Sequence, residues 1–361
     1  MVNEVYMTKK ALVAMSGGVD SAVAALLVKE AGFDTAGATM KLWSETEIVT
    51  DTYSGISTQD IGDAKKIADA LGIPHYTLSL GDTFRECVIN NFIAAYKNGE
   101  TPNPCVVCNK HLKFGKLLDI ARDMDFEYIA TGHYAQIDKT ESGRYVIKKA
   151  VDASKDQSYV LWSLSQDVLA HTLLPLGQYK KSEIREMAAA HGFSNAHKSD
   201  SQDICFIPDG DYVGFIKRTT GDTSPCGNFI DINGNILGQH SGVINYTIGQ
   251  RKGLGIALGK PMFVKEKDVL KNTVTLCDND ELFSTRLYAH SANFIAVDSI
   301  DTPMKVTAKI RYKHDAAPAT VEQTADGRFV LEFDTPQRAI AKGQSVVLYS
   351  DDIVVGGGII E

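Results

Sequence analysis

Hydrophobic and polar residues alternate in blocks along the first 210 residues. Short apolar runs of strand length are followed by longer stretches in which apolar residues recur at helical spacing. Alternation of this kind predicts an α/β domain with a parallel, doubly wound sheet, which binds ligands at the carboxyl ends of its strands. The expected strands are 11–15, 35–41, 75–80 and 127–131, and the expected helices include 22–31 and 58–71.

The pattern changes after about residue 208, where Gly, Asn and Asp become frequent and helical periodicity fades beyond the segment 211–219. Towards the C-terminus, apolar residues alternate with polar ones, as in half-buried strands. The segment 305–312 is one such strand, and the residues 325–328 form a hairpin turn between two others. We therefore expect a small C-terminal β-barrel. The predicted domains are 1–210, a small central α+β domain at 211–280, and the barrel at 281–361.

Length, charge and cysteine content narrow the class of protein. A chain of 361 residues is too long for one simple core, and a net charge of −8 argues against a surface that is basic throughout. Local clusters such as Lys110, Lys113 and Lys116 are more typical of a solvated face than of a phosphate track. No apolar run has the length of a membrane span, and the first ten residues lack a secretory signal. With six cysteines, the sequence predicts a cytoplasmic protein in which any disulfide would be catalytic.

A glycine-containing segment, 16–21, joins the first expected strand to the first expected helix with the sequence Ser-Gly-Gly-Val-Asp-Ser. Its two glycines let backbone N–H groups approach a phosphate closely, and we expect Asp20 and Ser21 to cap the helix. A helix N-terminus of this kind binds anions. Because the Lys-Ser/Thr of a Walker-type loop is missing, the segment is instead similar to the pyrophosphate loop (PP-loop) of ATP pyrophosphatases. Those enzymes adenylate a substrate oxygen and release pyrophosphate.

Two further segments contain cysteines with candidate chemistry. Cys105 and Cys108 are three residues apart and follow a stretch stiffened by prolines, a spacing that suits either a redox pair or metal ligation. A four-thiolate zinc site would need a second close pair, and the other cysteines are scattered. Cys205 lies among carboxylates and hydroxyls in the segment 200–207. Taken alone, it is more typical of a small buried apolar residue than of a nucleophile.

Together these segments resemble the tRNA-specific 2-thiouridylases of the bacterial MnmA (TrmU) type. The resemblance covers nearly the whole chain, and its most specific parts are 101–114 and the Gly-Gln-Arg-Lys-Gly-Leu-Gly sequence at 249–255. The pyrophosphate loop alone would be shared with asparagine, argininosuccinate, GMP and NAD synthetases. Further matching segments are 130–134, 155–159, 201–206 and 310–312. The resemblance implies an adenine nucleotide alpha hydrolase-like first domain and a central domain that binds tRNA.

The family resemblance implies ATP-dependent 2-thiolation of uridine at the wobble position (U34) of tRNA. Uracil C2 is unreactive because its oxygen is a poor leaving group. Transfer of AMP to that oxygen would make it a good leaving group. Mg²⁺ would neutralise the phosphates, held by Asp20 and by the phosphates themselves. The implied ATP-binding residues are Ala14, Met15, Ser16, Gly17, Gly18, Val19, Asp20, Ser21, Met40 and Gly132, with the adenine end near the last two.

The resemblance also implies the route of sulfur and the contacts with tRNA. By position, Cys205 carries a persulfide received from a cysteine desulfurase or a sulfur-relay protein, and Cys108 attacks it. A Cys108–Cys205 disulfide is left for later reduction. The implied target-base residues are Asn103, Pro104 and Cys105. The implied tRNA contacts are Lys155, Asp156, Gln157, Arg251, Lys252, Arg311 and Tyr312, with Arg311 on the polar face of the barrel.

One residue departs from the pattern of some relatives, which carry Asp where this chain has Cys105. That carboxylate has a general acid/base role, for which a thiol is the weaker group at neutral pH. Alternatively, Cys105, Cys108 and Cys205 could hold three irons of a [4Fe–4S] cluster. The persulfide route is the preferred interpretation. Two other hypotheses remain, namely an amidating or ligating synthetase, which needs no paired cysteines, and a non-catalytic tRNA-binding module.

Overall fold

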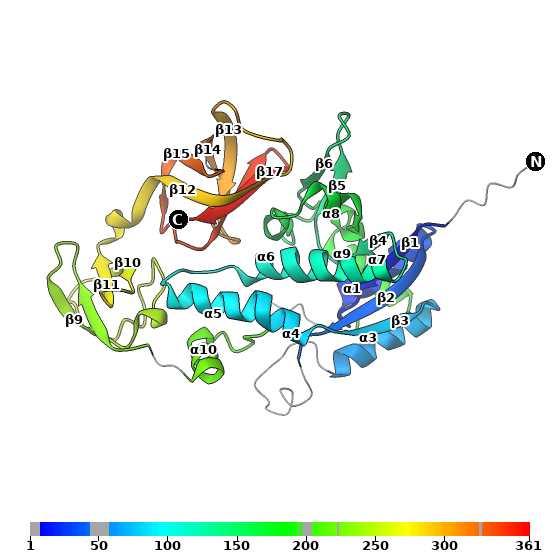
Figure 1. Cartoon of the computed structure of the whole chain (residues 1–361), viewed down its shortest axis with the longest axis horizontal. Helices are drawn as coiled ribbons and strands as arrows, with labels where there is room; N and C mark the ends of the chain where they lie inside the picture. The colour runs from blue at the N-terminus through cyan, green and yellow to red at the C-terminus, as the bar shows by residue number, and fades with distance from the viewer. Residues whose placement is uncertain (1–7, 44–57, 194, 197–203, 222–223, 325–326) are drawn as a thin grey trace, which may run out of the picture. The chain divides into compact units, whose positions relative to one another are not determined.

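The computed structural model describes residues 8–43, 58–193, 195–196, 204–221, 224–324 and 327–361, and these divide into two compact units. The first unit comprises Met1–Val88, Cys105–Pro208 and Asp352–Val354. The second comprises Ile89–Pro104, Asp209–Asp351 and Val355–Glu361. Figure 1 follows the chain through both, and each is described here by itself.

The first unit contains a five-stranded sheet in the order β3-β2-β1-β4-β7. Every pairing in it is parallel, which confirms the predicted fold class. The strand order reverses at β1, so the loop that follows β1 lies at the topological switch point where such sheets bind ligands. The strands are β1 Lys10–Ala14, β2 Asp34–Lys41, β3 His75–Ser79, β4 Tyr128–Ala130 and β7 Thr172–Leu173.

Helices cover both faces of this sheet, as the alternation of side chains along β1 requires (Figure 1). Ala11 and Val13 pack on one face against α1 Val19–Glu30, α3 Thr58–Leu71 and α9 Lys181–Ala190. Leu12 is equally buried on the opposite face, where α7 Leu117–Asp123 contacts β4. Because both faces are buried, β1 reads as a continuous apolar run rather than an alternating one.

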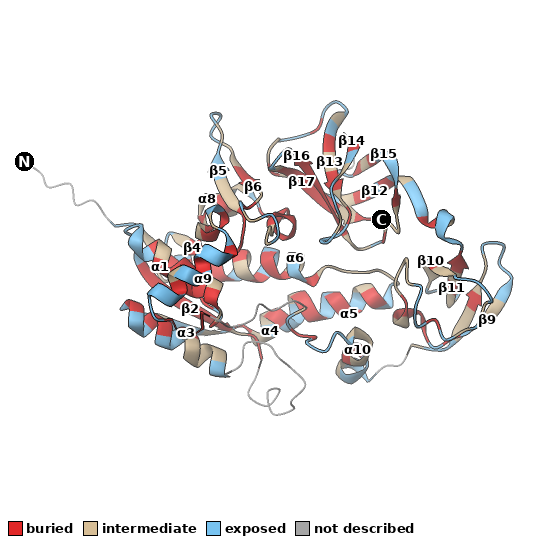
Figure 2. Cartoon of the chain, turned by 180° about the vertical axis from the view of Figure 1, so that it is seen from behind, coloured by how far each residue is buried: buried red, intermediate tan, exposed pale blue. Residues whose placement is uncertain are grey.

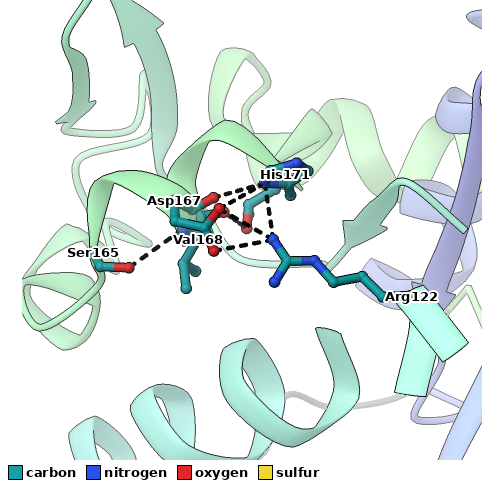
Figure 3. A network of polar contacts seen from close by, with 6 residues as sticks. Arg122, Ser165, Asp167, Val168 and His171 are labelled. Carbon is teal, nitrogen blue, oxygen red and sulfur yellow. Dashed lines mark hydrogen bonds and ion pairs between the residues drawn. The ribbon is translucent and has the colours of Figure 1, made fainter. Parts of the chain in front are cut away.

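One continuous helical stretch supplies the cysteine segment. It begins with α6 Pro104–Cys108, passes through the π-helix η2 Asn109–Lys116 and ends in α7. At its end, Arg122 contacts both carboxylate oxygens of Asp167 at 3.0 and 3.2 Å and Nδ1 of His171 at 3.3 Å (Figure 3). These residues are half exposed, so the contact holds α7 to α8 Gln166–Ala170 with little net stabilisation.

The other elements of the first unit connect the sheet to its surface. The antiparallel pair β5 and β6 forms a hairpin, and Lys149 N donates a hydrogen bond to Asp352 O at 2.8 Å. The π-helix η1 Arg85–Ile89 leads from this unit into the next. The remaining elements are α4 Gly81–Phe84, β5 Gln136–Lys139, β6 Tyr145–Lys148, η3 Ser158–Leu161 and η4 Pro175–Gln178.

The second unit has a small mixed sheet in the order β10-β11-β8-β9. Its core contains Phe229, Val264 and Val274. The ring of Tyr96, on α5 Asn90–Lys97, stacks on that of Tyr212 at the start of α10 with centroids 4.4 Å apart. The elements are α10 Tyr212–Thr220, β8 Gly227–Ile230, β9 Ile236–His240, η5 Val243–Asn245, β10 Phe263–Asp268, β11 Thr273–Cys277 and η6 Asn279–Leu282.

The C-terminal strands close into the predicted barrel. They follow the order β12-β15-β14-β13-β16-β17, and an additional pairing between β12 and β17 closes the ring. Figure 2 shows β16 and β17 almost wholly buried. The strands are β12 Phe283–Phe294, β13 Met304–Lys309, β14 Ala317–Gln323, β15 Phe329–Arg338, β16 Ser345–Ser350 and β17 Ile353–Ile360.

One predicted strand is shorter than expected. β13 ends at Lys309, and His314 N donates to Arg311 O at 3.0 Å, which closes a turn over these residues. Arg311 and Tyr312 therefore lie in the connection between β13 and β14 and not on the polar face of the barrel. The expected hairpin turn at 325–328 includes residues outside the described part of the chain. Within the described part, no helix has the length and apolar character needed to cross a bilayer.

Close packing around Gly177 gives a test of the first unit. A Cβ added there would lie 2.0 Å from the carbonyl oxygen of Ala135, so Gly177→Ala should cost about 1–3 kcal/mol. Gly62, inside α3, has open space around it, and Gly62→Ala should stabilise the helix by up to about 1 kcal/mol. Scanning calorimetry should show a lower melting temperature for Gly177→Ala and a higher one for Gly62→Ala than for the wild type. Shifts in the same direction would contradict the packing.

Candidate active site

The loop between β1 and α1 has a backbone that only small residues allow. Gly17 has φ of +73°, and a Cβ there would lie 2.5 Å from the carbonyl oxygen of Asp60. Gly132, just beyond β4, approaches the start of α1 so closely that its Cβ would lie 3.0 Å from Ser21 N. The two glycines therefore bring three backbone segments together at the switch point of the sheet.

The expected capping of α1 by Asp20 and Ser21 is wrong. The helix begins at Val19 with Gly18 as its N-cap, and no side chain forms a cap hydrogen bond there. Ser21 Oγ instead accepts from Ser16 N at 3.1 Å and donates to Gly18 O at 3.0 Å, which folds the loop back on itself. Because Gly18 has no side chain, the first N–H groups of α1 keep no internal cap and suit an external anion.

Asp20 takes part in a buried network that sequence reasoning missed. Lys181 Nζ lies 2.7 and 2.8 Å from the two carboxylate oxygens of Asp20, and Tyr134 donates its hydroxyl to Oδ1 at 2.7 Å. Lys181, the first residue of α9, is only 7% exposed, which is unusual for a lysine. No local motif around Lys181 marks it, because its partner lies far away in the sequence. The network fixes the loop to two distant segments.

The described residues do not form a magnesium site by themselves. Asp20 was the expected protein ligand, yet both its oxygens accept hydrogen bonds from Lys181. Across the described ranges, no three His, Cys, Asp or Glu side chains are grouped so that they could hold a metal ion.

The three cysteines of the predicted sulfur chemistry all lie in the first unit. Cys105 and Cys108 lie on α6, and Cys205 interacts electrostatically with both. Burial, together with the charges of Cys108 and Cys105, raises the pKa of the Cys205 thiol to about 12. Burial also raises the pKa of Cys108 and that of Cys105, whereas the ammonium of Lys113 lowers all three. All six cysteines of the chain are described, and none is in a disulfide.

Access to solvent differs among these thiols. The side chains of Cys105 and Cys205 reach the surface, whereas Cys108 is buried. His133 lies nearby and is also subject to the charge of Lys113; burial lowers its pKa well below the usual value, so it is neutral at pH 7. Its Nδ1 is 2.7 Å from Thr131 Oγ1. The residues 200–203 of the motif around Cys205 lie outside the described part of the chain.

The other predicted residues occupy different surroundings. Met40 is buried at the carboxyl end of β2, and Asn103 and Pro104 directly precede Cys105. Asp156 and Gln157 make internal contacts, since Asp156 accepts from Ala150 N at 3.0 Å and Gln157 accepts from Tyr134 N at 2.9 Å. The predicted tRNA residues exposed in the second unit are Arg251, Lys252, Arg311 and Tyr312.

Comparison with known families defines the class of protein. The family model "tRNA methyl transferase HUP domain" matches residues 9–209. The model "tRNA methyl transferase PRC-barrel domain" matches 214–278, and "Aminomethyltransferase beta-barrel domain" matches 284–360. The chain is therefore a HUP-domain protein that continues into a PRC-barrel domain and a C-terminal β-barrel.

Curated relatives define the family. A tRNA-specific 2-thiouridylase MnmA of Clostridioides difficile is 49% identical over 99% of this chain and 99% of its own. The relatives of the same name in Clostridium acetobutylicum and Lachnoclostridium phytofermentans are 49% and 48% identical over 98% of this chain, and over 100% and 99% of their own. The chain belongs to the MnmA family of tRNA-specific 2-thiouridylases.

Similarity to solved structures is lower. An NMN synthetase from Francisella tularensis is 18% identical with a TM-score of 0.33, covering 54% of this chain and 68% of that one. A 4-thiouridine synthetase, solved as an RNA complex with bound ATP, is 18% identical with a TM-score of 0.35, covering 59% and 51%.

The buried network predicts strong coupling between Asp20 and Lys181. Asp20→Asn or Lys181→Met alone leaves a polar group without its partner and should cost about 1–3 kcal/mol, given that Asp20 is partly exposed. The double variant should cost less than the sum of the two. Thermal unfolding of all four proteins measures this, with the exposed neighbour Lys180→Met as the control. Additive losses would contradict the network.

Proposed function

We propose that this chain converts the wobble uridine (U34) of tRNA to 2-thiouridine, using ATP and a cysteine-bound sulfur. The observation that carries the proposal is that Cys205 interacts electrostatically with Cys105 and Cys108 in a chain that belongs to the MnmA family over nearly its whole length. The same unit contains the loop at 16–21, whose geometry suits an anion. A nucleotide loop and a thiol cluster together match a reaction that needs both an activated oxygen and a sulfur nucleophile.

The first step is activation of the uracil. The C2 oxygen attacks the α-phosphorus of ATP, pyrophosphate leaves, and AMP becomes attached to O2 as a good leaving group. We assign ATP to residues 14–21, with its adenine end near Met40 and Gly132. The uncapped N-terminus of α1 supports a pyrophosphate site there. Lys181 forms an ion pair with Asp20, so its ammonium lies beside the loop to which we assign the phosphates of ATP.

The second step is transfer of sulfur. A cysteine desulfurase or a relay protein charges Cys205 as a persulfide, and the Cys108 thiolate attacks the inner sulfur. The step balances as Cys108–S⁻ + Cys205–S–SH → Cys108–S–S–Cys205 + HS⁻, in which the Cys108 sulfur is oxidised, the outer sulfur is reduced, and the Cys205 sulfur keeps the oxidation state that it had in the persulfide. Hydrosulfide then attacks C2, and AMP leaves with the former O2. The disulfide must be reduced before the next turnover.

We further propose that both units bind tRNA. Lys155, Asp156 and Gln157 would meet the anticodon loop, where single-stranded bases can be splayed and read. Arg251, Lys252, Arg311 and Tyr312 would contact the rest of the molecule, and their exposure supports this role. Asn103, Pro104 and Cys105 would face the target base. The domains 1–210, 211–280 and 281–361 are proposed as the functional divisions, and the cytoplasm as the place of action.

Exchange of labelled pyrophosphate into ATP tests the function against its rivals. Exchange that depends on unmodified tRNA, followed by 2-thiouridine formation when a persulfide donor is added, supports the proposal. An amidating synthetase would turn over without its cysteines, and a non-catalytic tRNA-binding module would bind tRNA without any exchange. Either result would refute the assignment.

The sulfur route predicts which cysteines matter. Cys108→Ser and Cys205→Ser should each reduce thiolation more than about 100-fold, because each removes a sulfur that forms a bond in the step above. Cys87→Ala, Cys226→Ala and Cys277→Ala should keep turnover within about twofold, since no candidate chemistry surrounds these residues. Mass spectrometry after loading with a desulfurase should find the persulfide on Cys205. A persulfide on Cys108 alone would reverse the assigned roles.

Cys105 distinguishes the persulfide route from an iron–sulfur cluster. On the persulfide route this residue only lines the base pocket, so Cys105→Ala and Cys105→Asp should keep substantial activity in a colourless protein. On the cluster route Cys105 is an iron ligand, and Cys105→Ala should lose iron and activity together. Anaerobic purification with absorption and iron analysis makes the comparison. A wild-type protein with a stable iron chromophore that Cys105→Ala abolishes would contradict the preferred route.

A further inference from the structure

Lys113 occupies a special position relative to Cys108. Cys108 directly precedes the π-helix η2, and Lys113 is the fifth residue after it. In an α-helix, a residue five positions on is rotated by about 140°. In a π-helix the hydrogen bonds join residues five apart, so Cys108 and Lys113 are one turn apart on the same side. The π-helical turn therefore places Lys113 on the side of the helix that carries Cys108. Short π-helical turns are frequent at functional sites.

Lys113 differs from the other lysines of this helix. It is half-buried, whereas Lys110 and Lys116 are exposed. Its positive charge acts on Cys105, Cys108 and Cys205 and on His133. Among the described residues, no carboxylate forms an ion pair with Lys113. His133 is neutral at pH 7 and adds no second cation.

The thiols need such a cation because their burial and their mutual repulsion disfavour negative charge. Burial acts against the thiolate at each of the three cysteines, and the cysteines repel one another when charged. The proposed transfer, however, carries one negative charge throughout, first on the Cys108 thiolate and then on hydrosulfide. A charge in a partly buried site is costly unless an opposite charge is near it. Within the described part of the chain, Lys113 is the one cation that acts on all three thiols.

We propose that Lys113 is the counter-charge of the sulfur site, stabilising anionic sulfur on Cys108 and Cys205 during sulfur transfer. The role in transfer rests on the proposed function, but the effect on the thiols does not. It holds for the protein without tRNA, ATP or a sulfur donor. Lys113 thus belongs to the sulfur chemistry rather than to a solvated basic face of the helix.

Alkylation of the full-length chain by iodoacetamide tests this directly. Rates at Cys105, Cys108 and Cys205 are measured one by one by peptide mass spectrometry from pH 6 to pH 10, and the exposed Cys226 of the second unit serves as the internal reference. Lys113→Met should slow alkylation of Cys108 and Cys205 at least about tenfold at a given pH, because loss of the ammonium raises the pKa of each thiol and leaves less thiolate. Lys113→Arg keeps the charge and should stay within about threefold of the wild type.

The matched controls are Lys110→Met and Lys116→Met, which remove the same charge from the same helix. They should leave the pH profiles of the thiols unchanged. An unchanged profile in Lys113→Met would overturn the proposal, as would an equal shift in either control. Lowered tRNA affinity without a change in thiol reactivity would mean that Lys113 contacts phosphate instead. If Lys113→Met unfolds, which its melting temperature reveals, Lys113→Gln serves as the variant without the charge: slower alkylation of Cys108 and Cys205 in it supports the proposal, and a wild-type profile decides against it.

Thiolation assays then separate this inference from the proposed function. Should the wild type fail to thiolate tRNA while Lys113→Met still shifts the alkylation profile, the function is wrong and the counter-charge stands. Should the wild type thiolate tRNA while the profile is unmoved, the function stands and the counter-charge is wrong.

Discussion

The contact between Asp20 and Lys181 is the constraint on which the rest of the site depends. It joins the first turn of α1 to the first residue of α9, and Tyr134 adds a hydrogen bond from the segment after β4. Three segments far apart in the sequence are thereby fixed at the switch point of the parallel sheet. An ion pair with one buried and one partly exposed partner stabilises only when its geometry is good, and here both oxygens of the carboxylate accept hydrogen bonds. The loop at 16–21 can then present its backbone donors without relying on a side-chain cap.

The sulfur site must satisfy two conflicting requirements. The surroundings raise the pKa of all three thiols and keep them protonated, but transfer needs a thiolate. The irregular helix through η2 reconciles the two, because it brings one cation to the thiols without exposing them fully. The same stretch connects Cys105 and Cys108 to α7, whose C-terminal end is held by Arg122. Rigid support of this kind keeps reacting groups within bonding reach of one another.

Local patterns predicted the fold well and the site only in part. The strands of the parallel sheet follow short apolar runs, and α3 matches its predicted bounds because Gly72 and Pro74 end it. The capping of α1 was mispredicted because Gly18, with no side chain, takes the cap position that Asp20 and Ser21 were expected to fill. The local sequence does not predict that Lys181 is buried, because the partner that allows its burial, Asp20, lies 161 positions away. Lys113 was assigned to a solvated cluster because such clusters are usually solvated, and nothing in the local sequence predicts the π-helical register that places it on the side of Cys108.

The claim that the loop at 16–21 serves to activate uridine O2 can be tested by following one oxygen atom. Unmodified tRNA is prepared with ¹⁸O at O2 of its wobble uridine, and the enzyme is supplied with ATP and a persulfide donor. Adenylation of O2 followed by attack of sulfur at C2 must release AMP that carries the ¹⁸O, and mass spectrometry of the AMP should show one label for each 2-thiouridine formed. AMP without label, with 2-thiouridine still produced, would contradict the account.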